Sequence, residues 1–272
     1  MKHYNFFKAI VAAFVFLSFS ANSQISICSW NIQNFGKSKS DNEIEFIANT
    51  IRNYDAVAII EVVAGYGGSQ AVAKLADALN RKGTKWDYSI SDPTTSITSG
   101  TERYAFLWKT SKLKKIGHAW LDGMYNKEIE REPYFITFES AKKYFTLAVF
   151  HAVPSSKHPE TEIKYLKNIF AEYPDKNIVF CGDYNCSQTS VVFDEIKSVG
   201  YKPIFTNQKT SLKNKQVGSE CLASEYDNIF YFPRTTKFIK SGVIPFYTSF
   251  KTLKDAKTIS DHIPIYFQFS LN

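Results

Sequence analysis

Two histidines and several carboxylates follow apolar segments at widely separated places in this chain of 272 residues. His151 ends the apolar run 146–150, and His262 stands in the tripeptide 260–262. Glu61 follows four apolar residues, and Asp183 follows another apolar run. Histidine titrates near neutral pH, so it can accept or donate a proton. Carboxylate oxygens are ligands of hard divalent cations. The combination predicts metal-assisted hydrolysis of a phosphate ester.

Amide and carboxylate side chains beside these residues extend the predicted metal site. Hard cations take oxygen ligands, and the chain supplies candidates at the same segment ends. The candidate ligands are Asn31, Glu61, Asp183, Asn185 and Asp261. We expect Mg²⁺ as the ion, with Ca²⁺ as a further candidate and Mn²⁺ as a substitute. Each residue alone has an ordinary explanation: Asn31 can satisfy a strand end, and residues 183–185 can form an Asx turn.

Alternating strand and helix patterns must bring these residues together. Apolar, β-branched runs predict strands at 25–30, 56–60, 104–108, 145–150, 178–181, 228–232 and 263–269. Apolar stripes at helical spacing predict helices at 41–53, 69–81, 158–173 and 191–199. Ser40 and Glu43 form a capping-box signature, and Gly200 is a C-terminal cap signal. We predict an α/β fold, a four-layer α/β/β/α sandwich with two packed mixed β-sheets flanked by helices.

The first 23 residues have the pattern of a secretory signal peptide. Lys2 and Lys8 flank the apolar run 6–19, and small residues follow at 21–23. The run is short for a membrane span of about 20 residues, although a retained anchor is the alternative. We therefore expect a secreted or periplasmic protein with a single domain at 24–272, acting as a monomer. No other segment is long and apolar enough to predict stable membrane association.

Charge and cysteine usage constrain the function only loosely. Without Lys2 and Lys8, 31 of the 33 basic residues remain against 26 acidic ones, so the formal net charge falls from +7 to +5. This excess favours a polyanionic partner but also occurs in proteins without one. Cys28 and Cys181 lie in apolar runs and are expected to be buried. Four cysteines allow three pairings, and no spacing typical of zinc sites occurs.

The motifs together resemble the endonuclease/exonuclease/phosphatase superfamily, and within it the secreted deoxyribonucleases of the pancreatic type. The resemblance covers nearly the whole mature chain, in order. It is carried by Trp30-Asn31-Ile32-Gln33-Asn34, Ile60-Glu61-Val62, Glu102-Arg103-Tyr104, Arg131-Glu132-Pro133, His151-Ala152-Val153-Pro154, Gly182-Asp183-Tyr184-Asn185, Tyr226-Asp227 and Asp261-His262. A single motif of this kind is weak evidence, whereas several in the family's order are strong evidence. The resemblance implies DNA as the substrate, with RNA as a second candidate.

The resemblance also implies a role for each residue. His151 and His262 would divide the proton transfers, oriented by Glu102 and Asp227 respectively. We predict His262 as the base and His151 as the acid. The remaining assignments are as follows: Asn31, Glu61, Asp183 and Asp261 bind metal, and Arg131, Asn185 and Tyr226 bind substrate. For Arg131 the alternative is a surface salt bridge with Glu128 or Glu132.

Three further features follow from the resemblance. It implies a disulfide between Cys186 and Cys221, which both lie in polar loops where a disulfide is plausible after export. Two family positions that reach the minor groove are Val63 and Gly100 here, which puts a preference for double-stranded DNA in doubt. Tyr66, in a glycine-rich loop, is available to stack on a base.

Two other functions compete with this interpretation. One is a secreted phosphodiesterase of the same superfamily that acts on RNA or lipid headgroups, although the sequence has no loop with clustered tryptophans. The other is a catalytically silent module that binds nucleic acid. A silent relative would have lost a metal ligand or a histidine, and all of them are present.

Overall fold

Two six-stranded sheets carry the site residues. The computed structural model describes residues 24–272 except 97 and 175, so the predicted signal peptide lies outside the described residues. The first sheet has the order β13 (Thr236–Val243), β14 (Ile265–Leu271), β1 (Gln24–Phe35), β2 (Ala56–Val63), β4 (Glu102–Lys109) and β3 (Trp86–Ile90). The second has the order β5 (Lys114–Leu121), β6 (Tyr134–Ser140), β7 (Lys143–His151), β8 (Ile178–Asp183), β12 (Asp227–Tyr231) and β9 (Lys202–Pro203).

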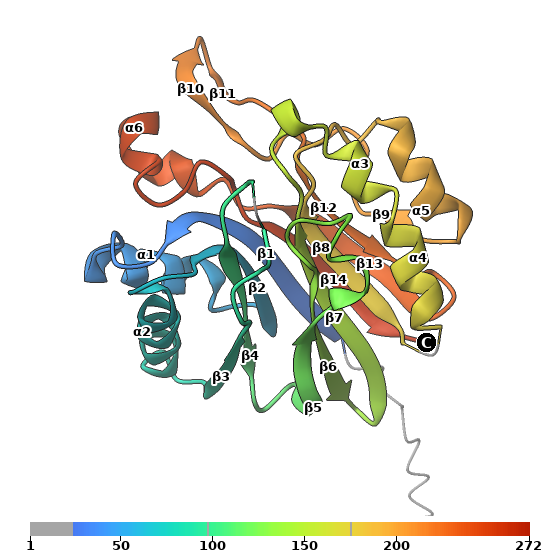
Figure 1. Cartoon of the computed structure of the whole chain (residues 1–272). Helices are drawn as coiled ribbons and strands as arrows, with labels where there is room; N and C mark the ends of the chain where they lie inside the picture. Colours follow the sequence, from blue (N-terminus) through green and yellow to red (C-terminus); the bar gives the residue numbers. More distant parts are fainter. Residues whose placement is uncertain (1–23, 97, 175) are drawn as a thin grey trace, which may run out of the picture.

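Both sheets are mixed, and each has one parallel pair at its centre. β1 is parallel to β2 in the first sheet, and β7 is parallel to β8 in the second. The other neighbours are antiparallel. A short hairpin of β10 (Leu212–Val217) and β11 (Glu220–Leu222) projects from the same end of the molecule as α6 (Leu253–Ala256) (Figure 1).

Helices cover the outer face of each sheet (Figure 1). The longer ones, α1 (Asp41–Ile51) and α2 (Gly68–Asn80), pack on the first sheet. The second sheet is covered by α3 (Glu160–Ile163), α4 (Leu166–Glu172) and α5 (Asp194–Ser198). The remaining short elements are α6 (Leu253–Ala256), η1 (Gly123–Tyr125), η2 (Ser155–Lys157), η3 (Val191–Phe193) and η4 (Phe246–Ser249). No helix among the described residues has the length and apolar character that a bilayer span requires.

Three hydrophobic clusters fill the spaces between the four layers. In β2, Val57 and Ile59 point towards α1 and α2, whereas Ala58 and Ile60 point towards the second sheet. Phe180 of β8 packs under the helices of the other outer layer. Strands buried on both faces have apolar residues at successive positions, which explains the continuous apolar runs. The predicted α/β/β/α sandwich is confirmed.

Local signals place the helices nearly as the sequence predicts. The Ser40–Glu43 capping box is formed at the start of α1. Gly200 has a positive φ of 96° after α5, as expected of a C-terminal cap. The helix predicted over 158–173 is instead broken into α3 and α4. At the break, Tyr165 N–H donates to the Glu162 carbonyl, three residues earlier. This bond closes a 3-10 turn, which is tighter than a turn of α-helix.

Candidate active site

The strand directions place the candidate residues at one end of the two sheets. Asn31 and Glu61 lie in the C-terminal parts of β1 and β2, which are parallel. Glu102 begins β4, which runs antiparallel to β2, so its first residue reaches the same end. His262 lies three residues before the start of β14, which is antiparallel to β1. The carboxyl ends of parallel strands and the amino ends of their antiparallel neighbours therefore meet there.

The second sheet contributes three residues that lie side by side on adjacent strands. His151 ends β7 and is paired in register with Asp183, the last residue of β8. Asp183 is paired on its other side with Asp227, the first residue of β12. All three side chains are buried. The packing of the two sheets then brings this row against the residues of the first sheet.

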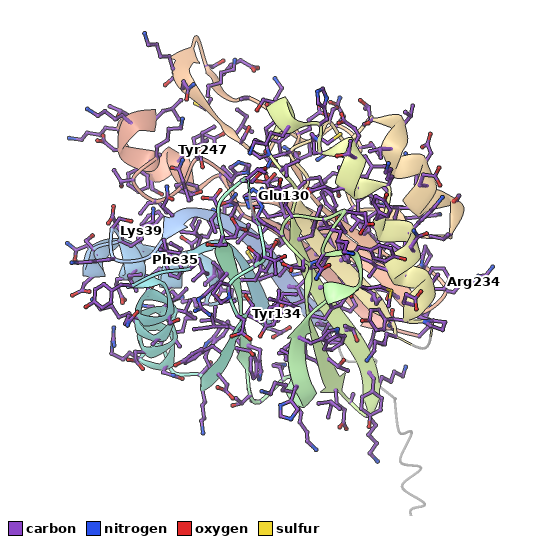
Figure 2. All side chains as sticks on the ribbon, in the orientation of Figure 1. Phe35, Lys39, Glu130, Tyr134, Arg234 and Tyr247 are labelled. Carbon is purple, nitrogen blue, oxygen red and sulfur yellow. The ribbon has the colours of Figure 1, made fainter. Side chains whose placement is uncertain are left out.

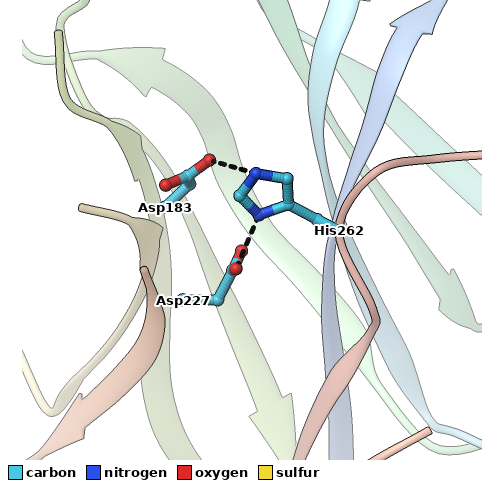
Figure 3. Close-up of side chains that lie close together, drawn as sticks. All are labelled: Asp183, Asp227 and His262. Carbon is cyan, nitrogen blue, oxygen red and sulfur yellow. Dashed lines mark hydrogen bonds and ion pairs between the residues drawn. The ribbon is translucent and has the colours of Figure 1, made fainter. Parts of the chain in front are cut away.

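His262 lies between two carboxylates. Its Nδ1 is 2.7 Å from Asp227 Oδ2, and its Nε2 is 3.5 Å from Asp183 Oδ2 (Figure 3). The backbone holds the ring in place, because His262 N–H donates to Ser260 Oγ and Trp30 Nε1 donates to the His262 carbonyl. An imidazole whose Nδ1 is held by a carboxylate has a fixed tautomer and a free Nε2 for proton transfer.

His151 has a matching arrangement. Its Nδ1 lies 2.9 and 3.0 Å from the two carboxylate oxygens of Glu102. Its Nε2 is 3.6 Å from Asp183 Oδ2 and 3.3 Å from Asn185 Nδ2. The backbone N–H of His151 donates to the hydroxyl of Tyr104. Both imidazoles thus have a carboxylate on Nδ1 and direct Nε2 at the same oxygen atom.

The carboxylates change the proton affinities of both rings. Burial and the positive charge of Arg131 both lower the pKa of His151. The charge and hydrogen bond of Glu102, together with the charge of Asp183, have the larger combined effect, so the pKa is raised above its ordinary value. Burial likewise lowers the pKa of His262, but Asp227 and Asp183 outweigh it and raise the pKa well above its ordinary value. Both rings therefore hold a proton more readily than a free imidazole does.

The two aspartates respond in opposite directions. Burial would raise the pKa of Asp183, but His262, His151 and the Asn31 amide hold it below its ordinary value. The pKa of Asp227 is raised, because burial and the charge of Asp183 outweigh the attraction of His262. Asp183 is thus the carboxylate that stays ionised between the two imidazoles.

Oxygen ligands for a cation gather beside Asp183. Asn31 Nδ2 donates to Glu61 Oε1 at 2.9 Å and to Asp183 Oδ2 at 3.0 Å. The other amide atom, Asn31 Oδ1, is buried and has no hydrogen-bond partner. A buried carbonyl oxygen without a partner costs free energy unless something such as an ion satisfies it. This donor set fits a hard divalent cation.

The other predicted ligand, Asp261, faces the same pocket from a different side. Its Oδ2 accepts a hydrogen bond from Gln33 Nε2 at 2.9 Å. A second group that could hold a metal ion consists of Asp183, Asp227 and His262, whose ligand atoms lie within 4.8 Å of one another (Figure 3). In that group His262 Nδ1 is already hydrogen-bonded to Asp227. Beside Glu61, by contrast, Asn31 Oδ1 has no hydrogen-bond partner, so the Asn31–Glu61 site is the better candidate for the metal ion.

A polar pocket of about 580 Å³ opens over these residues. Its lining includes Asn34, Glu61, Val63, Gly65, Gly100, Glu102, Arg131, His151, Asp183, Asn185, Asp261 and His262. Eight of the eleven predicted catalytic, substrate-binding and metal residues line it, and Asn31 and Asp227 are hydrogen-bonded to lining residues. Tyr226 lines a neighbouring cavity of about 420 Å³, which shares Asn185 with the first. The Tyr226 and His262 rings are stacked, with centroids 6.3 Å apart.

Arg131 lines the pocket and is held by bonds to neighbouring residues. It is only 4 % exposed, and its donors face the protein. Its Nη1 lies 3.2 Å from Glu102 Oε2, and its other donors bond the carbonyls of His151 and Ala152. The alternative of a surface salt bridge with Glu128 or Glu132 is not seen. Arg131 holds the end of β7 and the Glu102 carboxylate in place.

Two residues that the sequence did not single out also hold the site. Lys39, which is labelled in Figure 2, is buried. Its ammonium donates to the carbonyls of Thr258 and Ile259, both at 2.8 Å. This fixes the segment that leads into Asp261 and His262. Thr210, which is fully buried, accepts hydrogen bonds from the backbone N–H of Tyr226 and Asp227. Nothing in the sequence around Lys39 or Thr210 indicated that either residue would hold the site, because both stand in ordinary polar segments.

The implied Cys186–Cys221 disulfide is absent, and this prediction is wrong for the structure. All four cysteines are free thiols. Cys186 packs in the cluster under α3–α5, whereas Cys221 packs against the cluster of the first sheet. Their sulfur atoms face different partners, Glu160 and Ser219. Cys28 and Cys181 are buried, as predicted.

Comparison with known proteins identifies the family. The model of the Endonuclease/Exonuclease/phosphatase family matches residues 28–262, which include every candidate site residue. The chain belongs to this family. Its members generally use divalent metal ions, in agreement with the acidic cluster in the pocket. The chain is an enzyme that hydrolyses phosphodiester bonds.

Named relatives cover most of the chain at low identity. Deoxyribonuclease gamma of Rattus norvegicus is 27 % identical over 275 residues, covering 90 % of this chain and 84 % of the relative. A deoxyribonuclease of Thioalkalivibrio is 26 % identical over 282 residues, covering 95 % and 74 %. A solved family protein from Bacteroides thetaiotaomicron has a TM-score of 0.68 at 16 % identity, covering 92 % of this chain and 98 % of that protein, and so supports the fold.

Proposed function

We propose that this protein is a secreted, divalent-metal-dependent endonuclease that hydrolyses the phosphodiester bonds of DNA by two-histidine acid/base catalysis. The observation that carries the proposal is the meeting of two imidazoles at Asp183, each with its own carboxylate on Nδ1. One ring can take a proton while the other gives one, which is what in-line displacement at phosphorus requires. The deoxyribonuclease names of the relatives support DNA as the substrate.

His262 acts as the base in this proposal. Its Nε2 accepts a proton from the water that attacks phosphorus, and Asp227 on Nδ1 stabilises the resulting imidazolium. Burial lowers the pKa of His262, but Asp227 and Asp183 raise it and so favour the protonated ring that this step produces. His151 acts as the acid, because its Nε2 gives a proton to the leaving oxygen while Glu102 keeps the ring oriented. Exchange of protons with water then restores both rings.

Asn31, Glu61, Asp183 and Asp261 would hold the metal ion. Asn31 already links Glu61 to Asp183, and its Oδ1 is an unused buried ligand. When bound, Mg²⁺, with Ca²⁺ or Mn²⁺ as alternatives, polarises the phosphoryl oxygens and offsets the negative charge of the substrate. The protein's part is to hold these four oxygen ligands in and beside the pocket that the two histidines share.

Substrate contacts are proposed for residues around the pocket. Asn185 has its amide 3.3 Å from His151 Nε2, so it can contact a phosphate placed between the histidines. The Tyr226 ring is stacked on the His262 ring. Tyr226 can therefore pack against the substrate strand on either side of the scissile bond. Arg131 lines the pocket and forms an ion pair with Glu102. It therefore acts on the substrate mainly by long-range electrostatic attraction of the phosphate.

Export is proposed from the sequence of residues 1–23, which carries the signal-peptide pattern. Cleavage would leave a single domain at 24–272, acting as a monomer. The test is N-terminal sequencing of the protein recovered from the medium or periplasm. A protein that begins at Met1 and stays with the membrane fraction would instead indicate a retained anchor.

The decisive experiment offers the purified protein several substrates in parallel. Supercoiled plasmid, single-stranded DNA, RNA and sphingomyelin vesicles are each incubated with Mg²⁺ and Ca²⁺ or with EDTA. We expect plasmid nicking that EDTA abolishes and that the folded double variant His151→Ala/His262→Ala has lost. Release from vesicles without nicking would favour a lipid phosphodiesterase. DNA retention without cleavage would favour a silent binding module, and full activity of the double variant would defeat the mechanism.

A further inference from the structure

One exposed aromatic residue lies at the rim of the catalytic pocket. Tyr66 is 80 % exposed, the most exposed aromatic side chain of the described residues. It follows Gly65, which lines the pocket, and it precedes α2. The residues that line the pocket include no phenylalanine, tyrosine or tryptophan. Tyr66 is therefore the aromatic group available to a nucleotide on this side of the catalytic residues.

The turn that presents Tyr66 is fixed in shape. Gly67 has a φ of 97°, and a Cβ there would lie 2.7 Å from Lys37 Cβ. A Cβ on Gly68 would lie 1.9 Å from the carbonyl oxygen of Val63. Gly67 N–H also donates to the side chain of Gln70. The glycines thus let the turn pack closely against its neighbours. An aromatic ring on a fixed turn loses little conformational entropy on binding.

A positive charge accompanies the ring. Lys37 Nζ lies 5.6 Å from the centroid of the Tyr66 ring, and Lys37 is exposed. The pocket itself carries several carboxylates, and its cation Arg131 is buried against Glu102. A strand that leaves the pocket therefore meets a free positive charge for its next phosphate on the Tyr66 side. Aromatic faces for bases beside cations for phosphates are the features of single-strand binding grooves.

We propose that Tyr66 and Lys37 form a subsite that stacks one unpaired base next to the scissile phosphodiester and binds its flanking phosphate. This deepens the proposed nuclease function and rests on it. In a duplex both faces of an internal base are covered by its neighbours, so the ring can stack only on a base of a single strand or a frayed end. The absence of long side chains at Val63 and Gly100, which also line the pocket, agrees with such a substrate.

The subsite is tested by binding without cleavage. Fluorescence anisotropy measures the affinity of the full-length protein in EDTA for a fluorescein-labelled oligothymidine and for a strand of equal length made of abasic residues. Stacking of one base changes affinity by roughly 5- to 100-fold. We expect Tyr66→Ala to weaken oligothymidine binding by this factor and leave the abasic strand unaffected, and Tyr66→Phe to retain affinity. Lys37→Ala should lower the salt dependence by about 0.7 in logarithmic slope.

A matched control is Tyr144→Ala. Tyr144 is also exposed, at 57 %, and lies at the opposite end of β7 from His151. The Tyr144→Ala variant should bind the oligothymidine and the abasic strand with the same affinities as the unaltered protein. Equal loss on the abasic strand, no loss with Tyr66→Ala, or the same loss with Tyr144→Ala would overturn the subsite. Plasmid nicking by the unaltered protein is scored separately, so a protein that binds as predicted but cleaves nothing contradicts the nuclease function alone.

Discussion

Nε2 of His151 and Nε2 of His262 lie 3.6 and 3.5 Å from one oxygen atom, Asp183 Oδ2. The two rings come from different sheets, yet they approach this carboxylate at nearly equal distances. Each ring is tied at its other nitrogen to a separate carboxylate. The arrangement couples two proton-transfer groups through a shared ionised residue, and most of the predictions below follow from it.

The bond between His262 and Asp227 should control the tautomer of the ring. Asp227→Asn preserves the shape but removes the charge that stabilises the imidazolium, so we expect kcat to fall by about 10²–10⁴-fold. His262→Ala should cost as much, and the double variant little more, because the two residues act as a unit. Plasmid nicking rates measure this, with circular dichroism to check the fold. Simple additivity of the two losses would contradict a shared function.

Arg131 should matter for stability more than a surface residue that binds phosphate would. Arg131→Met leaves Glu102 and two carbonyls without their buried partner, and breaking such a pair costs about 3–5 kcal/mol. The matched control is Arg234→Met, at an exposed position (Figure 2), which should stay within about 0.5 kcal/mol. Urea denaturation gives both values. An Arg131→Met protein of unchanged stability with a raised KM would instead support the phosphate-binding role predicted from the sequence.

Lys39 should position the segment that carries His262. Lys39→Met keeps the buried stem but loses two hydrogen bonds from a charged group, each worth about 1.5–3 kcal/mol. We expect lower stability and a lower kcat with little change in KM. Lys74→Met removes an exposed ion pair with Asp41 and should change stability by at most about 1 kcal/mol. Similar effects of the two substitutions would show that Lys39 has no special role.

Glu130 should make the loop before β4 sensitive to acid. Burial opposes ionisation, but hydrogen bonds from Thr98, Ser99 and Ser96 lower the pKa of Glu130 to about 2. A depressed pKa stabilises the fold at pH values above the ordinary value of 4.5, and the contribution is lost as the pH falls towards 2. The stability difference between the unaltered protein and Glu130→Gln should therefore shrink below pH 4.5. Glu128→Gln, at an exposed position nearby, should show no such trend.

All four cysteines should titrate as free thiols in the unfolded protein. Four free cysteines predict that Ellman's reagent detects four thiols per chain in urea and that a reducing agent leaves the melting temperature unchanged. In the native protein Cys28 should react slowly, because burial raises its pKa well above the ordinary value. A disulfide-linked peptide containing Cys186 in a non-reduced digest would contradict the structure.

The sequence predicted the central strands because burial on both faces demands continuous apolar runs. It missed β5 and β13, whose edge positions leave many side chains exposed. It missed β6 for a different reason: the two-residue turn between β6 and β7 is Ala141-Lys142, both with positive φ. Hairpin turns of that kind are usually marked by asparagine or glycine. The turn therefore carried no local signal.

Several site residues were predictable because they end apolar runs. Glu61 and His151 are polar residues at the ends of buried strands, where a structural role is uncommon. Residues that act through the backbone of others, such as Lys39 and Thr210, carry no such mark. The orientation of Arg131 depends on where Ala152 and Glu102 place their oxygen atoms. That information exists only after the two sheets have packed.

The origin of the pocket from two sheets has a consequence for how the chain acquires activity during its synthesis. β14 is the last of the described strands to be made, and it completes the first sheet by pairing with β1. Until that pairing forms, His262 has no fixed place, and His151 faces an incomplete site. Nascent or truncated chains should therefore be harmless to nearby nucleic acids, with competence gained in one step when the last strand inserts.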